Sequence, residues 1–204
     1  MILNQIKKSE LRKFFPVFDF DNTIINELDY IFPIFNETLN SIDLDQKSKK
    51  ELEICYVNHF QKFGSKGIID ALNIEIHKRE IFLKKYIENL RKPRMFPQKI
   101  ICNESFKKFV NSEYFAPKNI IIISNGNPLQ QKNKFNNTNF EGIEKKIKLI
   151  CANEYEPKPS PSSFNENFFE KKQYLYIGDS IIDMKFAQNA KIDFLNITSL
   201  RNIF

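Results

Sequence analysis

The sequence predicts an α/β fold with a mainly parallel sheet and a small all-helical segment inserted after the first strand. Three short apolar runs, each ending in small or polar residues, predict the strands. Helical patterns lie between and after these runs, an alternation typical of parallel sheets. The inserted segment shows several helix signals in series and lacks a convincing strand.

The predicted strands are FFPVF before Asp19, NIIIIS before Asn125 and YLYIG before Asp179. Runs this short and apolar are typical of strands buried on both faces of a parallel sheet. In such sheets ligands bind beyond the carboxyl ends of the strands, where all three runs meet polar residues. We therefore expect the functional site at this edge of the sheet. Core helices are predicted at residues 105–110 and 181–190 from the spacing of apolar residues.

We assign residues 1–26 and 94–204 to the α/β core and residues 27–93 to the helical insertion. One inserted helix is predicted from a capping box at Ser48 to a stop at Gly64. Its expected apolar face comprises Leu52, Cys55, His59 and Phe63. A second helix is predicted near residues 76–92. Its expected apolar face comprises Leu83, Ile87 and Leu90, and Pro93 ends it.

Composition and charge narrow the class of protein. The 204 residues carry a net charge of +6, and the basic residues are scattered in short groups. This pattern indicates a solvated surface that attracts anions, with nucleic-acid binding a minor alternative. The three cysteines have no CxxC spacing, which argues against disulfides or structural zinc. Without a signal-peptide pattern or a long apolar run, we expect a cytoplasmic protein with no membrane partner.

The first strand ends in DFDNT, which places the carboxylates of Asp19 and Asp21 one residue apart. On an extended backbone both project to the same side. Like charges this close are unfavourable unless a cation compensates them, and a hard divalent ion with oxygen ligands would do so. For the motif taken alone, a simple turn or helix cap is the favoured interpretation.

The other strand ends add complementary groups. Ser124, Asn125 and Gly126 offer a hydroxyl, an amide and a flexible backbone that would donate to a phosphate oxygen, although alone they indicate an ordinary turn. Asp179 and Asp183 are four residues apart on an opening helix and would share a face. Asp179 alone would equally serve as an N-cap, and Lys158, between two prolines, would alone be a surface residue.

Four motifs in this order resemble those of the haloacid dehalogenase (HAD) superfamily: PVFDFDNT, IIIISN, KPSP with its Lys158, and GDSIID. The resemblance spans Phe15 to about Ala190. The KPSP form and the early insertion resemble the phosphoglycolate phosphatase-like and β-phosphoglucomutase-like branch, whose members carry a helical (C1-type) cap. The resemblance implies a Rossmann-like three-layer core. Glycines common in relatives are missing around residues 188–191.

The resemblance also implies a role for each motif residue. Asp19 would be the nucleophile and Asp21 the general acid and base, while Lys158 would neutralise the phosphoryl group and Asp19. The phosphate would be held by Ser124, Asn125 and Gly126. A Mg²⁺ ion would be bound by the Asp19 side chain, the Asp21 backbone carbonyl and the Asp179 side chain. Asp183 would not bind the metal directly but would orient a metal-bound water molecule.

The sequence thus predicts a magnesium-dependent phosphatase that hydrolyses a small cytoplasmic phosphomonoester through an aspartyl phosphate. A phosphomutase acting on a sugar phosphate would share every motif and stays an alternative. A non-enzymatic basic binding module is disfavoured because the whole set of site residues is present. The sequence does not choose among phosphoglycolate, sugar phosphates and nucleotides, and it does not predict an oligomeric state.

Overall fold

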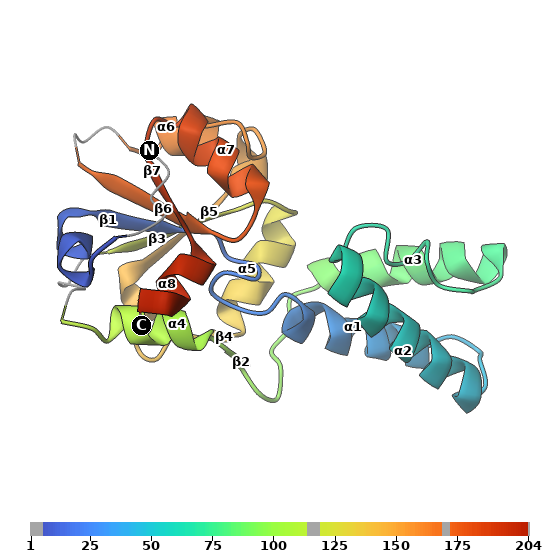
Figure 1. Cartoon of the computed structure of the whole chain (residues 1–204). Helices are drawn as coiled ribbons and strands as arrows, with labels where there is room; N and C mark the ends of the chain where they lie inside the picture. The colour runs from blue at the N-terminus through green and yellow to red at the C-terminus, as the bar shows by residue number, and fades with distance from the viewer. Residues whose placement is uncertain (1–5, 114–118, 169–171, 204) are drawn as a thin grey trace. The chain divides into compact units, whose positions relative to one another are not determined.

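The computed structural model describes residues 6–113, 119–168 and 172–203. Contacts within the chain divide it into two compact units (Figure 1). The core unit comprises residues 1–26 and 94–204, and the helical unit comprises Glu27–Pro93. Each unit is described by itself.

The core unit is built on a five-stranded parallel sheet with the strand order β5-β3-β1-β6-β7. The three apolar runs form its central strands, which confirms the predicted fold class. The strands are β1 (Phe15–Phe18), β3 (Ile120–Ser124), β5 (Ile147–Cys151), β6 (Tyr174–Gly178) and β7 (Asp193–Asn196). Val17 on β1 is paired with Ile121 on β3 and with Tyr176 on β6, so the carboxyl ends of these strands lie together.

Helices cover both faces of this sheet (Figure 1). Side chains alternate between the faces of a strand. Val17 accordingly packs in a cluster with Phe186 of α7 (Ile181–Asn189). The ring of its neighbour Phe18 contacts Phe106 and Phe109 of α4 (Glu104–Val110) on the other face. The core helices are α4 (Glu104–Val110), α5 (Pro128–Asn136), α6 (Ser162–Asn165), α7 (Ile181–Asn189) and α8 (Ile197–Ile203).

Several short elements complete the core unit. A two-stranded parallel sheet joins β2 (Ile100–Ile101) to β4 (Thr138–Asn139). Short 3₁₀ helices cover Lys8–Lys13, Glu144–Lys146 and Ala152–Glu154. Neither this sheet nor β5 and β7 was predicted from the sequence. In the outer strand β5 the first three residues are at least partly exposed and only the last two are buried, so it lacks the continuous buried pattern of the central strands.

The helical unit contains α1 (Leu28–Asn40), α2 (Gln46–Phe63) and α3 (Ile76–Arg91). Aromatic rings fill its interior. The Phe35 ring of α1 stacks on Tyr56 of α2 with 4.0 Å between centroids and meets Phe82 of α3 edge-on. A 2.7 Å hydrogen bond joins the hydroxyls of Tyr56 and Tyr86, so both rings bury their polar atoms with a partner.

The start of α2 was predicted wrongly. Its N-cap is Asp45, whose carboxylate accepts hydrogen bonds from the backbone N–H and the hydroxyl of Ser48. Ser48 therefore lies inside the first turn and does not cap the helix. The predicted end is confirmed, because Gly64 adopts φ +69° as the C-cap residue, a backbone conformation that favours glycine.

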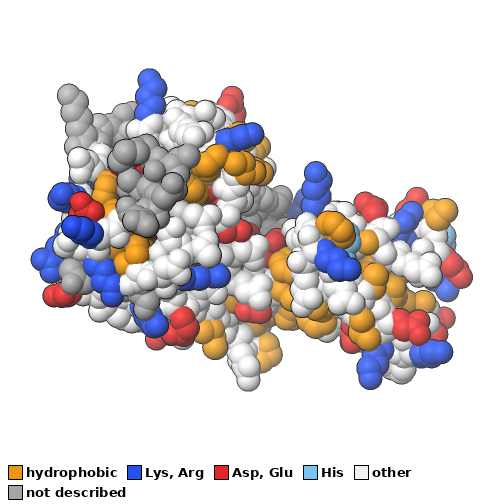
Figure 2. Space-filling model, viewed as in Figure 1, with side chains coloured by type: hydrophobic (Ala, Val, Ile, Leu, Met, Phe, Trp, Pro, Cys, Tyr) orange, Lys and Arg blue, Asp and Glu red, His pale blue; other side chains and the backbone are white. Residues whose placement is uncertain are grey.

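The predicted apolar face of α2 is confirmed only at Leu52, and the predicted face of α3 was wrong. The buried residues are Leu52 and Tyr56 on α2, and Phe82 and Tyr86 on α3. Aromatic side chains bury more area than aliphatic ones, and here they turn each helix toward Phe35. Hydrophobic side chains consequently remain at the surface of the helical unit (Figure 2). The most exposed large ones are Ile54, Phe63, Ile76, Ile81 and Leu83.

Within the described part of the chain, no helix has both the length and the apolar character needed to cross a membrane. All three cysteines, Cys55, Cys102 and Cys151, are free thiols.

Candidate active site

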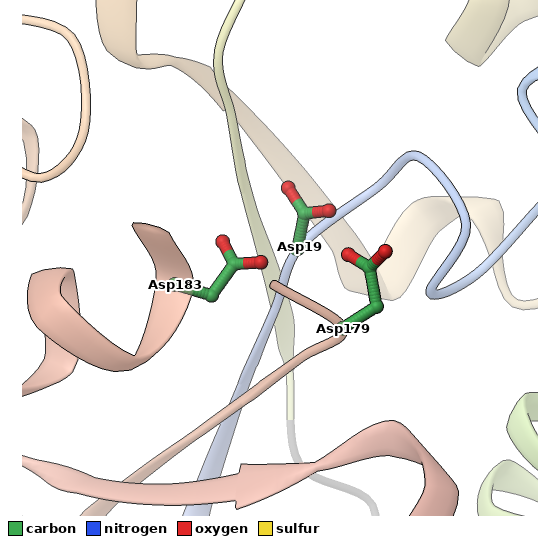
Figure 3. A group of neighbouring side chains, drawn as sticks. All are labelled: Asp19, Asp179 and Asp183. Carbon is green, nitrogen blue, oxygen red and sulfur yellow. The ribbon is translucent and has the colours of Figure 1, made fainter. Parts of the chain in front are cut away.

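Three carboxylates gather at the carboxyl ends of the central strands (Figure 3). Asp19 follows β1, Asp179 follows β6, and Asp183 lies in the first turn of α7. One carboxylate oxygen of each lies within 4.8 Å of the other two. Asp19 and Asp183 are buried and Asp179 is exposed, so the cluster reaches from the protein interior to solvent.

The start of α7 positions Asp183. Ser180 is the N-cap, and its hydroxyl accepts from the Asp183 N–H at 3.2 Å. In return, Asp183 Oδ2 accepts from the N–H and the hydroxyl of Ser180 at 3.1 and 2.6 Å. This reciprocal capping box immobilises Asp183. Asp179 lies before the helix, so the expectation that Asp179 and Asp183 share a helix face was wrong, and the N-cap role falls to Ser180.

Gly178 makes room for this arrangement. A Cβ atom added at Gly178 would lie 2.6 Å from Asp183 Cβ and 2.8 Å from Asp183 Oδ2. Neither atom can withdraw without breaking the capping box. The glycine of GDSIID is thus required by close packing against the acid that follows it.

Lys158 connects two of the three acids. Its ammonium Nζ donates to Asp19 Oδ1 at 2.7 Å, to Asp183 Oδ1 at 2.7 Å and to the Tyr176 hydroxyl at 2.9 Å. A lysine ammonium has three N–H donors, so these acceptors use all of them. Lys158 is only 6% exposed, and the interior position is tolerated because every donor is paired with an acceptor.

Asn125 fixes the backbone of the lysine loop. Its side chain accepts from the Lys158 N–H at 2.7 Å and donates to the Lys158 carbonyl at 3.1 Å. The Gly126 N–H donates to Asn153 Oδ1 at 2.7 Å, and the buried Ser124 hydroxyl donates to the Asn125 carbonyl at 3.2 Å. Each group that was predicted to hold a phosphate therefore has an internal partner, which a bound phosphate oxygen would replace or share.

The Asp21 carboxylate forms an ion pair with a second buried lysine. Lys134 of α5 donates from Nζ to both carboxylate oxygens of Asp21 at 2.6 Å, and the Lys134 side chain is completely buried. Lys134 was not predicted from the sequence, because a lysine in the polar stretch QQKNKF carries no signal that its side chain is buried. The two carboxylates of DFDNT thus each have an ammonium partner, Lys158 for Asp19 and Lys134 for Asp21.

Burial and mutual repulsion raise the pKa of Asp19 and of Asp179. For Asp19, burial raises the pKa to about 8, with Asp183 and Asp21 adding to the rise and Lys158 opposing it. For Asp179, burial and the charge of Asp183 raise the pKa. Burial acts to lower the pKa of Lys158, but Asp19, Tyr176 and Asp183 hold it well above its usual value. Three ionised carboxylates would carry more negative charge than the one ammonium of Lys158 neutralises.

This donor set fits a hard divalent cation. Carboxylate oxygens are the ligands that Mg²⁺ prefers, and a second positive charge would relieve the repulsion among Asp19, Asp179 and Asp183. The exposed Asp179 leaves a path from solvent to the cluster.

Tyr176 was also missed from the sequence. Its hydroxyl is buried, accepts from Lys158 Nζ, and lies 3.0 Å from the Ile123 carbonyl and 3.3 Å from Asp183 Oδ1. We expect Tyr176→Phe to lower the free energy of unfolding by about 1–3 kcal/mol, because a buried N–H of Lys158 loses its acceptor. Denaturant unfolding measures this. Tyr155→Phe, at a partly exposed ring, is the control, and equal stability of the two variants would contradict the prediction.

Comparison with known proteins is consistent with this geometry. Residues 17–197 match the model of a family described as haloacid dehalogenase-like hydrolase. No curated protein sequence matches the chain.

Three similar solved structures share the fold. The HAD-hydrolase YfnB from Bacillus subtilis, bound to magnesium, is 17% identical over 94% of this chain and 97% of its own, with a TM-score of 0.57. A protein described as a beta-phosphoglucomutase from Thermotoga maritima is 13% identical over 92% and 96%, with a TM-score of 0.53. A protein described as a phosphoglycolate phosphatase from Lactobacillus plantarum is 15% identical over 92% and 88%, with a TM-score of 0.50.

Proposed function

Since the chain belongs to the haloacid dehalogenase-like hydrolases, we propose that it is a magnesium-dependent phosphatase that hydrolyses a small cytoplasmic phosphomonoester through an aspartyl phosphate. One observation carries the proposal. The buried Asp19 carboxylate lies at the end of β1 with its Oδ1 2.7 Å from Lys158 Nζ, and two further acids lie beside it. This arrangement combines a positioned nucleophile with charges suited to a phosphoryl group.

In the first half of the reaction, a carboxylate oxygen of Asp19 attacks phosphorus and the ester oxygen leaves. Asp21 gives a proton to that oxygen, and Lys158 offsets negative charge on Asp19 and the phosphoryl group. In the second half, Asp21 takes a proton from a water molecule that attacks the phosphorus of the aspartyl phosphate. Phosphate then leaves and the Asp19 carboxylate is restored.

Ser124, Asn125 and Gly126 would hold phosphoryl oxygens. Mg²⁺ would be held by the Asp19 side chain, the Asp21 backbone carbonyl and the Asp179 side chain. When bound, it supplies positive charge that offsets the developing charge on the phosphoryl oxygens. Asp183 keeps Lys158 in place through the 2.7 Å hydrogen bond and is the third carboxylate of the acidic cluster.

We assign residues 27–93 the part of a cap that selects the leaving group and excludes water. The expected partner is a small phosphorylated metabolite, in keeping with the net charge of +6. The three free thiols fit a reducing compartment.

A phosphomutase would use the same residues, and the likeness to the Thermotoga maritima protein keeps this second candidate open. Activation by a sugar bisphosphate, with isomerised rather than dephosphorylated product, would identify it.

The proposal is tested by measuring phosphate release from a panel of phosphomonoesters, including phosphoglycolate, sugar phosphates and nucleotides, with Mg²⁺ and with a chelator. We expect turnover of at least one ester with Mg²⁺ and none with the chelator. Turnover that is equal under both conditions would contradict the role of the metal, and no turnover of any ester would contradict the phosphatase itself.

Metal binding has a readout separate from activity. We expect Mg²⁺ to raise the melting temperature of the wild type, because it binds the folded acidic cluster and not the unfolded chain. Asp179→Asn removes one expected ligand and should abolish most of this shift. Glu166→Gln, an exposed carboxylate elsewhere in the core unit, should keep it. A shift of the same size in Asp179→Asn would contradict the assignment of Asp179.

A further inference from the structure

Lys134 is the second buried lysine of the core unit that contacts an acid of the DFDNT motif. Its side chain is 0% exposed, while the Asp21 side chain it contacts is 20% exposed. Burying an ammonium costs several kcal/mol unless it is paired and hydrogen-bonded. Lys134 is nevertheless buried where α5 contacts Asp21, the carboxylate that transfers protons in the proposed function.

The backbone around Lys134 is held rigidly. Its carbonyl accepts from the buried Thr138 hydroxyl at 2.9 Å and from the Asn137 N–H at 3.2 Å. The Asn137 side chain in turn accepts from the Phe96 N–H at 2.6 Å and donates to the Arg94 carbonyl at 2.9 Å. The last turn of α5 is thereby tied to the small β2-β4 sheet, so Lys134 projects from a fixed base.

The contact leaves Asp21 able to react. A carboxylate has about four lone-pair sites, and Lys134 takes one on each oxygen. A site on either oxygen is left for a substrate or a water molecule. Asp21 follows the buried Phe20 and precedes Asn22, whose φ of +57° turns the chain. A carboxylate at a turn needs an external contact to stay in one place, and Lys134 provides it.

We propose that Lys134 is a positioning residue that holds the Asp21 carboxylate where it exchanges protons with the leaving oxygen and the attacking water. The inference rests on the proposed function. Lys134 acts through Asp21 and touches neither substrate nor phosphorus. Its effect is therefore confined to the steps that need Asp21.

Two aryl phosphates of similar shape separate those steps. Phenolate, whose conjugate acid has a pKa of about 10 as in tyrosine, needs a proton to leave, whereas p-nitrophenolate is a weak base and leaves without one. The ratio kcat/KM covers the steps up to phosphoryl transfer to Asp19. Loss of the Asp21 position should therefore lower kcat/KM for phenyl phosphate and spare it for p-nitrophenyl phosphate.

For Lys134→Gln we expect kcat/KM to fall about 100-fold with phenyl phosphate, the scale of a misplaced catalytic group, and less than about 5-fold with p-nitrophenyl phosphate. Lys132→Gln is the matched control, because Lys132 lies on the same helix, is exposed and, among the described residues, forms an ion pair with Glu154 alone. It should behave as the wild type with both esters. Lys134→Arg keeps the charge and should recover part of the loss with phenyl phosphate.

A double-mutant comparison tests whether Lys134 acts through Asp21. In the Asp21→Asn background, adding Lys134→Gln should change kcat/KM for phenyl phosphate by less than about 3-fold, because the two losses are not additive when one residue acts through the other. A full additional loss would overturn the inference, as would equal losses of Lys134→Gln on both esters. If Lys134→Gln does not fold, the same comparison is made with Lys134→Arg, whose kcat/KM should fall more with phenyl phosphate than with p-nitrophenyl phosphate.

Failure of the proposed function gives a different result. Wild-type protein that releases phosphate from neither aryl ester and from no ester of the metabolite panel with Mg²⁺ overturns the proposed function and this inference with it. Wild-type turnover combined with unselective losses overturns the role of Lys134 alone.

Discussion

Replacing Asp19 with asparagine is expected to lower phosphate release by about 10⁴-fold or more, the scale seen when a catalytic nucleophile is removed. The amide keeps the size of the side chain but cannot attack phosphorus. The substitution changes the one group that the proposed mechanism phosphorylates. It also removes the carboxylate charge that Lys158 contacts at 2.7 Å. Phosphate release from the preferred ester, with Mg²⁺ and with a chelator, measures the effect.

Glu166→Gln is the control for this substitution, since it makes the same change of carboxylate to amide at an exposed position of the core unit. It should keep wild-type turnover. The melting temperature of Asp19→Asn distinguishes a folded, inactive enzyme from a misfolded one. If folded Asp19→Asn turned over at the wild-type rate, Asp19 would not be the nucleophile.

Replacing Lys158 with methionine is expected to have the second-largest effect, and it combines stability with activity. Without the ammonium, the buried Asp19 and Asp183 face each other uncompensated. Breaking a buried ion pair by removing one partner costs about 3–5 kcal/mol of the free energy of unfolding. Turnover should fall by about 10²–10³-fold, as when a group that stabilises transition-state charge is removed.

A second variant separates the two effects. Lys158→Met with Asp183→Asn removes one of the unpaired carboxylates and should recover part of the stability without recovering turnover. Lys185→Met, at an exposed lysine of α7, is the control for both measurements. Wild-type stability of Lys158→Met, measured by denaturant unfolding, would contradict the importance of the buried network.

The sheet could be predicted where the strands are most deeply buried. The central strands β1, β3 and β6 are buried at every position except Phe15 and appear in the sequence as continuous apolar runs. The outer strands β5 and β7 contain partly exposed positions and escaped detection. On α2 and α3 the spacing predicted helices, but the buried face was decided by aromatic packing around Phe35, a tertiary effect that spacing does not contain.

The candidate site shows the same division. Asp19, Asp179 and Asp183 were expected to gather because parallel strands end at one edge of a sheet, and they do. Lys134 and Tyr176 escaped detection because their contacts depend on side chains reaching across 113 and 18 residues of sequence, to Asp21 and Lys158. In the sequence, Tyr176 of YLYIG is indistinguishable from the other apolar positions of the predicted strand.

The most direct test of the central claim is the mass of the Asp19 peptide after an acid quench during turnover of p-nitrophenyl phosphate. Asp21→Asn is the variant of choice, because it lacks the base that hydrolyses the aspartyl phosphate and should accumulate it. We expect one added phosphoryl group on Asp19 in this variant and none in Asp19→Asn. A phosphoryl group on another residue, or p-nitrophenol release by Asp21→Asn with no phosphorylated peptide, would contradict the account.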